Sequence, residues 1–167
     1  MKKFPILLSA GAVLLLVFCV VVTMLSPRYQ ASKLLDTDLP RPVQTQWEDN
    51  HGGFHGDGIF LGQLTFSPSS GKSLEKNLAQ DARWKPLPMG ETLVLFLSGG
   101  EKDGVTYGGV WPEGKAIPAV EEGYSFFLDR LHNTTADDLL LDDSSHNITV
   151  GLYDCQQSTL YLFTYDS

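Results

Sequence analysis

Cysteine is scarce in this chain. The 167 residues include two cysteines, Cys19 and Cys155, and Cys19 lies inside a long apolar run. A single cysteine outside that run cannot form an internal disulfide, so a disulfide-stapled domain is excluded. Cys155 is expected to be a buried, inert thiol, or else to pair with another chain.

Basic residues are also few. The chain has 12 Lys and Arg against 20 Asp and Glu. Only Lys2 and Lys3 precede position 26, and no acidic residue does, so the rest of the chain carries a net charge of −10. A surface of this sign repels phosphate backbones and anionic lipid headgroups, which argues against nucleic-acid partners.

Complete catalytic motifs are missing as well. Residues 71–73 read GKS, the end of a phosphate-binding loop, but Phe66 stands where that loop needs its first glycine. Ser98 follows an apolar run, but Phe96 stands where a nucleophile elbow needs glycine. These gaps favour a non-enzymatic role.

What the chain does have is an uninterrupted apolar run of 22 residues, positions 4–25. A bilayer core about 30 Å thick needs roughly 20 residues of helix, so the run predicts one transmembrane helix. It exceeds the roughly 7–15 apolar residues of a cleaved signal peptide, and no small-residue cleavage pattern follows it. We therefore expect an uncleaved, single-pass anchor in the cell membrane, with the bilayer as its partner.

The flanking charges give the orientation of this anchor little bias. Lys2 and Lys3 precede the run, and Arg28 and Lys33 follow it closely. A short basic head before one helix and a long polar domain favours a cytoplasmic N-terminus. The C-terminal domain is then expected outside the cytoplasm.

The sequence predicts three parts: a cytoplasmic head and anchor at 1–25, a proline-containing tether at 26–46, and an extracytoplasmic domain at 47–167. Prolines at 27, 40 and 42 favour a semi-extended tether. The alternative for its first part is a short helix, with Ser26 as N-cap and Pro27 as first helical residue.

The third part is expected to be α+β, with a mainly antiparallel sheet of about five strands and one helix. The helix is expected at 73–82, capped by Ser73. Alternating or continuous apolar patterns predict the strands, at 58–66, 91–97, 124–130 and in a hairpin over 147–166. The run at 91–97 is typical of a central strand buried on both faces.

A histidine-rich segment, residues 49–58, contains the residues most suited to bind a metal. On an extended strand His55 and Asp57 lie about 7 Å apart on one face, close enough to share an ion. His51 joins them only if the glycines at 52–53 fold the chain back. No cofactor is required by the sequence, and zinc is the metal that a His51, His55 and Asp57 site would take.

Such a zinc site would need one more ligand from a distant part of the chain; Glu48, Asp49, His132 and His146 are the candidates. The alternative is a glycine-rich strand entrance in which the histidines bond backbone groups. No established zinc spacing is matched, which favours the alternative.

Four stretches carry a resemblance: residues 51–58 (HGGFHGDG), 84–88 (WKPLP), 123–130 (GYSFFLDR) and the closing hairpin at 147–166. Together they resemble an uncharacterised family of short membrane-anchored proteins from Gram-positive bacteria. The resemblance implies a bacterial source and brings no activity or ligand with it. The family pattern has a histidine after Arg130, where this chain has Leu131 and then His132.

Three classes of function remain open. The leading hypothesis is a membrane-tethered extracytoplasmic module with a non-enzymatic role in binding or in the cell envelope. The alternative is a small metal-dependent hydrolase that uses His51, His55 and Asp57. The third is a subunit of a larger membrane complex, with a protein partner at the envelope.

Overall fold

The structure is a computed structural model, and it describes residues 13, 15–18, 21–24, 26–52, 56–137 and 140–167. The chain divides into two compact units, Met1–Leu39 and Pro40–Ser167. Much of the predicted anchor at 4–25 lies outside the described residues.

The first unit contains helix α2 (Pro27–Leu35), which begins where the sequence offers a helix as the alternative to an extended tether. Ser26 is its N-cap and accepts a hydrogen bond from Tyr29 N at 3.3 Å, and Pro27 supplies the first helical residue. The helix ends at Asp36, which adopts the left-handed conformation with φ 46°.

Among the described residues, none of the helices by itself has both the length and the apolar composition of a membrane span. Two helical stretches, Leu15–Met24 and Pro27–Leu35, reach the length and composition of a span only when taken together, and they are bent by 56°. The membrane anchor stays a prediction from the sequence.

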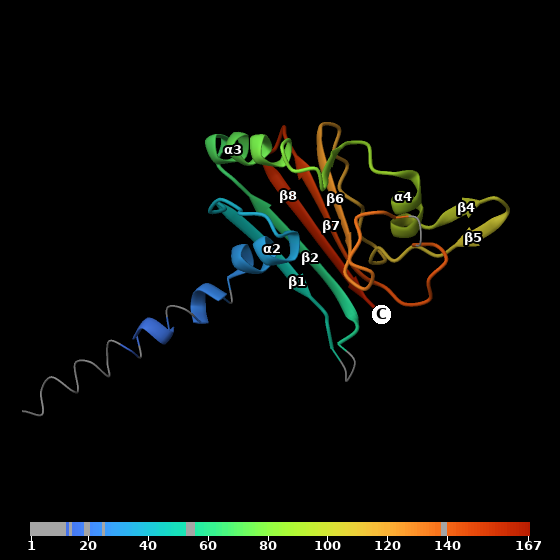
Figure 1. Ribbon diagram of the computed structural model, residues 1–167, viewed down its shortest axis with the longest axis horizontal. Helices are drawn as coiled ribbons and strands as arrows, with labels where there is room; N and C mark the ends of the chain where they lie inside the picture. Colours follow the sequence, from blue (N-terminus) through green and yellow to red (C-terminus); the bar gives the residue numbers. More distant parts are fainter. Residues whose placement is uncertain (1–12, 14, 19–20, 25, 53–55, 138–139) are drawn as a thin grey trace, which may run out of the picture. The chain divides into compact units, whose positions relative to one another are not determined.

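The second unit is α+β, and six of its described strands form one antiparallel sheet in the order β1-β2-β8-β7-β6-β3 (Figure 1). The strands of this sheet are β1 (Gln44–Asp49), β2 (Gly58–Thr65), β3 (Trp84–Pro86), β6 (Gly123–Asp129), β7 (Asn147–Asp154) and β8 (Thr159–Asp166). A separate ribbon pairs β4 (Gly100–Lys102) with β5 (Val105–Tyr107).

The strands predicted at 58–66 and 124–130 and the closing hairpin are confirmed as β2, β6, β7 and β8. In the hairpin, Val150 faces Phe163 and Leu152 faces Tyr161, as the alternating pattern predicts. β1 begins at Gln44, three residues before Trp47, and its mostly exposed side chains give it no apolar face by which the sequence could reveal it.

The strand predicted at 91–97 is wrong, because this segment forms helix α4 (Glu91–Ser98). Leu93, Phe96 and Leu97 are buried, whereas Val94 is 39% exposed, which is the spacing of one helix face. A short apolar run does not separate a buried strand from a short helix, and Gly90 and Gly99 bound it on both sides.

The predicted helix at 73–82 exists but begins earlier, as α3 (Pro68–Leu78). Its N-cap is Ser67 rather than Ser73, and Pro68 takes the first helical position. Gly71 lies within the helix at a close approach, since a Cβ there would stand 2.3 Å from Ser158 Oγ. The GKS sequence is therefore part of a packed helix and not of a phosphate loop.

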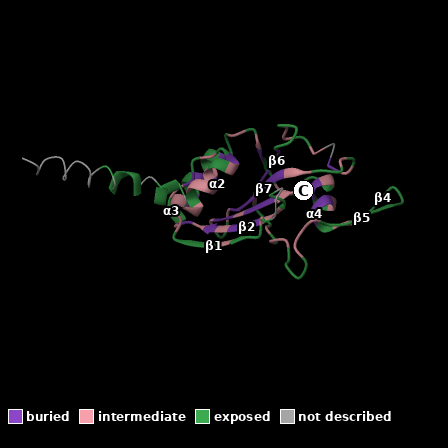
Figure 2. Ribbon diagram, turned by 90° about the horizontal axis from the view of Figure 1, so that it is seen from below, coloured by how far each residue is buried: buried purple, intermediate pink, exposed green. Residues whose placement is uncertain are grey.

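Both faces of the sheet are packed, and β6 and β7 are buried along most of their length (Figure 2). On the face next to α4 the buried cluster consists of Leu93, Phe96, Leu97, Phe127, Leu140, Ile148, Val150 and Phe163. On the other face Tyr153, in register with Leu160, donates its buried hydroxyl to Gly71 O of α3 at 2.9 Å.

Candidate functional site

Of the three predicted metal ligands, the structure describes His51 and Asp57. His55 lies outside the described residues. The segment turns back between β1 and β2, since Gly52 N donates to Asp57 O at 3.3 Å. The His51 ring is held by two carboxylates, with Nδ1 2.6 Å from Asp49 Oδ1 and Nε2 2.9 Å from Asp166 Oδ2.

His51 therefore links the β1–β2 connection to the end of β8. Its backbone N–H also donates to Asp49 Oδ1 at 3.0 Å, and the hydrogen bonds from His51 hold the pKa of Asp49 below its usual range. Asp166 also accepts a hydrogen bond from the Arg130 guanidinium. These contacts use both ring nitrogens of His51, which favours a structural role.

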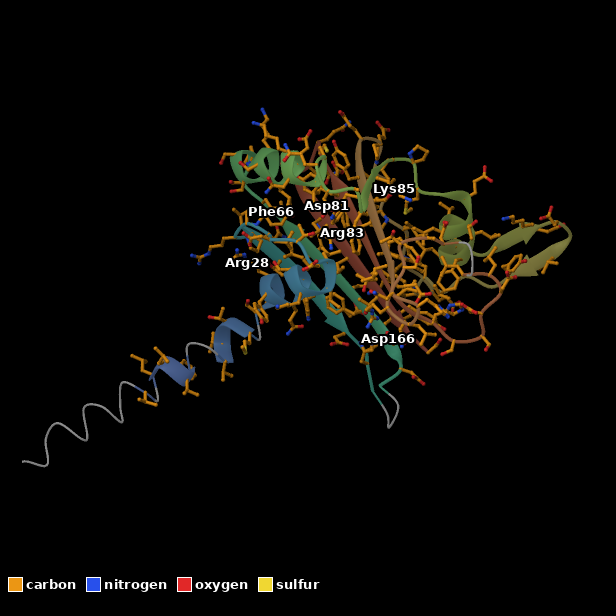
Figure 3. All side chains as sticks on the ribbon, in the orientation of Figure 1. Arg28, Phe66, Asp81, Arg83, Lys85 and Asp166 are labelled. Carbon is orange, nitrogen blue, oxygen red and sulfur yellow. The ribbon has the colours of Figure 1, made fainter. Side chains whose placement is uncertain are left out.

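A different group of side chains could hold a metal ion. Asp129, His132 and Asp143 offer ligand atoms that all lie within 4.8 Å of one another (Figure 3 draws the side chains on the ribbon). His132 Nδ1 lies 2.6 Å from Asp129 Oδ2 and 3.7 Å from Asp143 Oδ2. His132 is one of the distant ligands considered from the sequence, whereas Asp129 and Asp143 come together only through the fold.

The same group is also a local turn. Asp129 Oδ1 accepts the backbone N–H groups of Leu131 and His132 at 2.8 and 3.1 Å. Burial raises the pKa of Asp129, but the hydrogen bonds from His132 and Leu131 outweigh it and leave the pKa lowered. The bond to Asp129 raises the pKa of His132. A charged His132–Asp129 pair closing a turn explains this geometry without an ion.

Cys155 is a free thiol, half-buried at the turn between β7 and β8. Burial, together with nearby carboxylates such as Glu75, raises its pKa to about 11. The thiol is therefore protonated at neutral pH and is a poor nucleophile.

A groove over β1, β2 and β8 has a cavity volume of about 340 Å³. This lies in the range of small-molecule sites, about 300–1,000 Å³. The sheet groove, as we call it, is lined by Gln46, Trp47, Glu48, Leu61, Gly62, Gln63, Trp111, Lys115, Ala116, Pro118, Tyr161 and Leu162. All of these residues belong to the second unit.

The floor of the sheet groove follows from strand register. Gln46 pairs with Gln63, and Gln63 pairs with Tyr161, so the three side chains form one row on the same face of the sheet. Two residues further along β1, Glu48 pairs with Leu61 of β2. Glu48 was considered from the sequence only as a zinc ligand, and Gln46, Gln63 and Tyr161 were not predicted as site residues, because glutamines on a strand look like ordinary surface.

The wall of the sheet groove is the loop that follows β5. Trp111 N donates to Leu97 O at 2.9 Å and Val110 N donates to Phe96 O at 3.2 Å, which ties the loop to α4. Gly109 permits this approach, since a Cβ there would stand 2.5 Å from the Ser98 carbonyl carbon. Lys115 then reaches across the groove to pair with Glu48.

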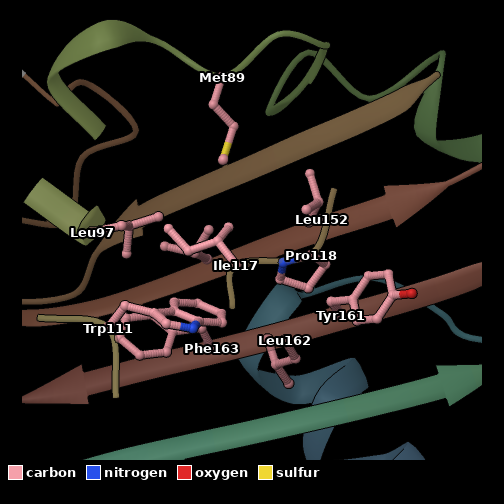
Figure 4. Close-up of a pocket in the computed structure, with 10 residues that line it drawn as sticks. Met89, Leu97, Trp111, Ile117, Pro118, Leu152, Tyr161, Leu162 and Phe163 are labelled. Carbon is pink, nitrogen blue, oxygen red and sulfur yellow. The ribbon is translucent and has the colours of Figure 1, made fainter. Parts of the chain in front are cut away.

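The indole of Trp111 forms the junction between the sheet groove and a small apolar pocket of about 20 Å³ (Figure 4). Its ring lies against Phe163 with centroids 4.8 Å apart. Within the described residues its Nε1 is buried and has no hydrogen-bond partner. An unpaired buried donor costs about 1–3 kcal/mol, so its retention calls for an explanation.

Three further polar groups in the sheet groove are unpaired. The side chains of Gln46, Gln63 and Tyr161 make no hydrogen bond to any other described residue. Burial raises the pKa of Tyr161, so its hydroxyl is a neutral donor and acceptor at physiological pH. The sheet groove thus combines apolar side chains with three polar ones that a ligand can reach, Gln46, Gln63 and Tyr161, whereas the Trp111 Nε1 is buried.

No family model, curated protein or solved structure matches this chain.

Proposed function

We propose that this chain is a membrane-tethered binding module, non-enzymatic, with the sheet groove of its second unit as the binding site. The sheet groove is the observation that carries the binding role, because it combines a ligand-sized volume with amide and phenol groups from Gln46, Gln63 and Tyr161.

The tether rests on the sequence. The apolar run at 4–25 supports insertion into the cell membrane, and the acidic remainder of the chain, with the binding domain, is proposed to lie outside the cytoplasm. The resemblance to membrane-anchored proteins of Gram-positive bacteria supports the same placement. A protein partner at the envelope is compatible with it.

Membrane retention tests the tether. Membranes from cells that make the full chain are washed with alkaline carbonate, which releases peripheral proteins. We expect the wild-type chain to stay in the pellet. A variant with Leu15→Arg and Leu16→Arg should be released, because each arginine costs about 2.5–3.5 kcal/mol at the centre of a span.

The matched control is a variant with Leu131→Arg, an exposed residue of the second unit. It adds charge without touching the run and should stay in the pellet. Release of the wild-type chain by carbonate would contradict the proposed membrane tether.

A metal-dependent hydrolase is the second candidate, favoured by the close approach of Asp129, His132 and Asp143. The sequence hypothesis for the same function uses His51, His55 and Asp57. Micromolar zinc should raise the melting temperature of the full chain if either group binds it. Loss of the rise in His132→Asn would assign the first group, and loss in His55→Ala the second; no rise in the wild-type chain would exclude both.

A further inference from the structure

The chemistry of the sheet groove restricts what it can bind. Its charged side chains, Glu48 and Lys115, form one ion pair with no net charge. The other polar groups are neutral: two amides and a phenol. Because the groove has no net charge, it does not favour a strongly charged ligand such as a phosphate, and the ligand is expected to be neutral and polar.

The unpaired groups also require a ligand that both donates and accepts hydrogen bonds. Each glutamine amide offers an acceptor oxygen and a donor nitrogen, and the Tyr161 hydroxyl does both. Hydroxyl groups satisfy such a mixed set, because each can donate and accept in turn.

Apolar surface lies directly beside these groups. Leu61 and Pro118 line the groove with the Trp111 and Tyr161 rings, and the small pocket next to Trp111 is lined by side chains such as Met89 and Ile117 (Figure 4). A pyranose ring matches this combination, since it carries hydroxyls around its rim and C–H groups on its faces. Aromatic side chains with one polar end are suited to such a ligand.

The dimensions fit more than one sugar unit. Gln46, Gln63 and Tyr161 stand on three neighbouring strands, which are roughly 4.8 Å apart, so the row spans about 10 Å. This is comparable to two linked pyranose units. β1 is the edge strand of the sheet, so a longer chain can continue past Gln46.

We propose that the sheet groove binds a neutral oligosaccharide, with Gln46, Gln63 and Tyr161 bonded to sugar hydroxyls and the Trp111 ring against the sugar. The proposal rests on the binding role proposed above and adds the class of ligand. A proline-rich peptide is the nearest competitor for an aromatic groove. It offers mainly carbonyl acceptors, which would leave the glutamine oxygens unpaired.

The test is calorimetric titration of the full chain in micelles of a detergent without a sugar headgroup. The probes are neutral tetrasaccharides of glucose, N-acetylglucosamine, mannose, galactose or xylose, with a proline-rich decapeptide for comparison. We expect at least one tetrasaccharide to bind and the peptide not to. Tyr161→Phe and Gln63→Met should each weaken that binding about three- to tenfold, the value of one hydrogen bond.

The controls are Gln44→Met on the same edge strand and Tyr165→Phe on β8, neither of which lines the groove. Both should bind as the wild type does, and Tyr161→Phe keeps the aromatic ring, so packing is preserved. Three outcomes would overturn the proposal: no tetrasaccharide binds, the peptide binds in their place, or binding survives both groove variants. None of these outcomes affects membrane retention. A failure of the proposed ligand class can therefore be distinguished from a failure of the proposed membrane tether.

Discussion

At the scale of single residues, buried polar atoms divide into those that the fold pairs and those that it leaves open. Tyr153 and Trp111 are one example of each kind. The Tyr153 hydroxyl donates to Gly71 O, and burial raises its pKa to about 12. The Trp111 Nε1 has no partner among the described residues. We interpret the Tyr153 hydroxyl as structural, whereas the Trp111 Nε1, like Thr149 Oγ1, is a buried atom that the fold leaves unpaired.

Removal of the Tyr153 hydroxyl tests the structural half of this division. Tyr153→Phe leaves Gly71 O without its side-chain donor in the buried interface between α3 and the sheet. We expect the free energy of unfolding to fall by about 1–2 kcal/mol, measured by urea titration. The matched variant Tyr165→Phe, whose hydroxyl has no hydrogen bond to a described residue, should change stability little. Equal effects would contradict the division.

Gly71→Ala tests the close approach of α3 to the turn between β7 and β8. Alanine normally stabilises a helix relative to glycine, but here its Cβ would lie 2.5 Å from Ser158 Cβ. We expect destabilisation of about 1–3 kcal/mol by overpacking. Adding Ser158→Gly should restore stability, because it removes the clash and suits the positive φ of 50° at that position. Failure of this rescue would show that the clash is not the cause.

The His132–Asp129 pair predicts a pH dependence. The pKa of Asp129 is lowered from 3.8, so its stabilising effect is present above that pH and is lost as pH falls through the folded-state pKa. The pKa of His132 is raised from 6.5, so its effect is present below that pH and is lost as pH rises through the folded-state pKa. The pair stabilises most between these two values.

His132→Asn should therefore lower the melting temperature more at pH 5.5 than at pH 8.5. Leu131→Ala, in the same turn and without a titratable side chain, should shift the melting temperature equally at both pH values. A His132→Asn effect that does not change with pH would show that the ion pair contributes nothing to stability.

At the scale of secondary-structure elements, the sequence predicts those whose pattern is set by one buried face. β2 shows strict alternation around Phe60 and Leu64, and the β7–β8 hairpin pairs the side chains that the pattern pairs. α4 is missed because a short apolar run is compatible with either a buried strand or a helix. Only the packing of Leu93, Phe96 and Leu97 on the sheet decides between them.

The candidate site is less visible in the sequence than the fold. The histidine-rich segment draws attention by composition, yet His51 is held by Asp49 and by Asp166, which is far away in the chain. The sheet groove depends on the register of three strands and on the loop carrying Trp111. Register between distant strands is set by tertiary packing, so no local pattern could assemble Gln46, Gln63 and Tyr161 in one row.

The loop that walls the sheet groove gives a prediction at this scale. Gly109→Ala would place a Cβ within 2.7 Å of Gly99 N and Leu97 O, so the loop must move away from α4. We expect greater acrylamide quenching of tryptophan fluorescence, as Trp111 leaves Phe163, and a loss of stability of about 1–3 kcal/mol. Gly108→Ala, where a Cβ meets nothing within 4 Å, is the control and should do neither. Unchanged quenching in Gly109→Ala would show that the contact of the loop with α4 does not hold Trp111 in its place beside the groove.

At the scale of the whole molecule, the chain joins an apolar N-terminal run to an acidic α+β unit. In the proposed arrangement residues 4–25 hold the chain in the membrane, and Pro40–Ser167 presents the sheet groove outside the cytoplasm. A single labelled residue on the second unit can report whether the chain is in the membrane and on which side of the membrane this unit lies. The exposed Lys102 on the β4–β5 ribbon is suited to it.

The most direct test is labelling of intact cells with a membrane-impermeant maleimide. The chain carries Lys102→Cys in a background with Cys19→Ser and Cys155→Ser, so the ribbon holds the one reactive thiol. A tethered outer domain predicts full labelling without permeabilisation, with the label recovered in the carbonate-washed membrane pellet. Labelling that requires permeabilisation, or label recovered in the soluble fraction, would contradict it.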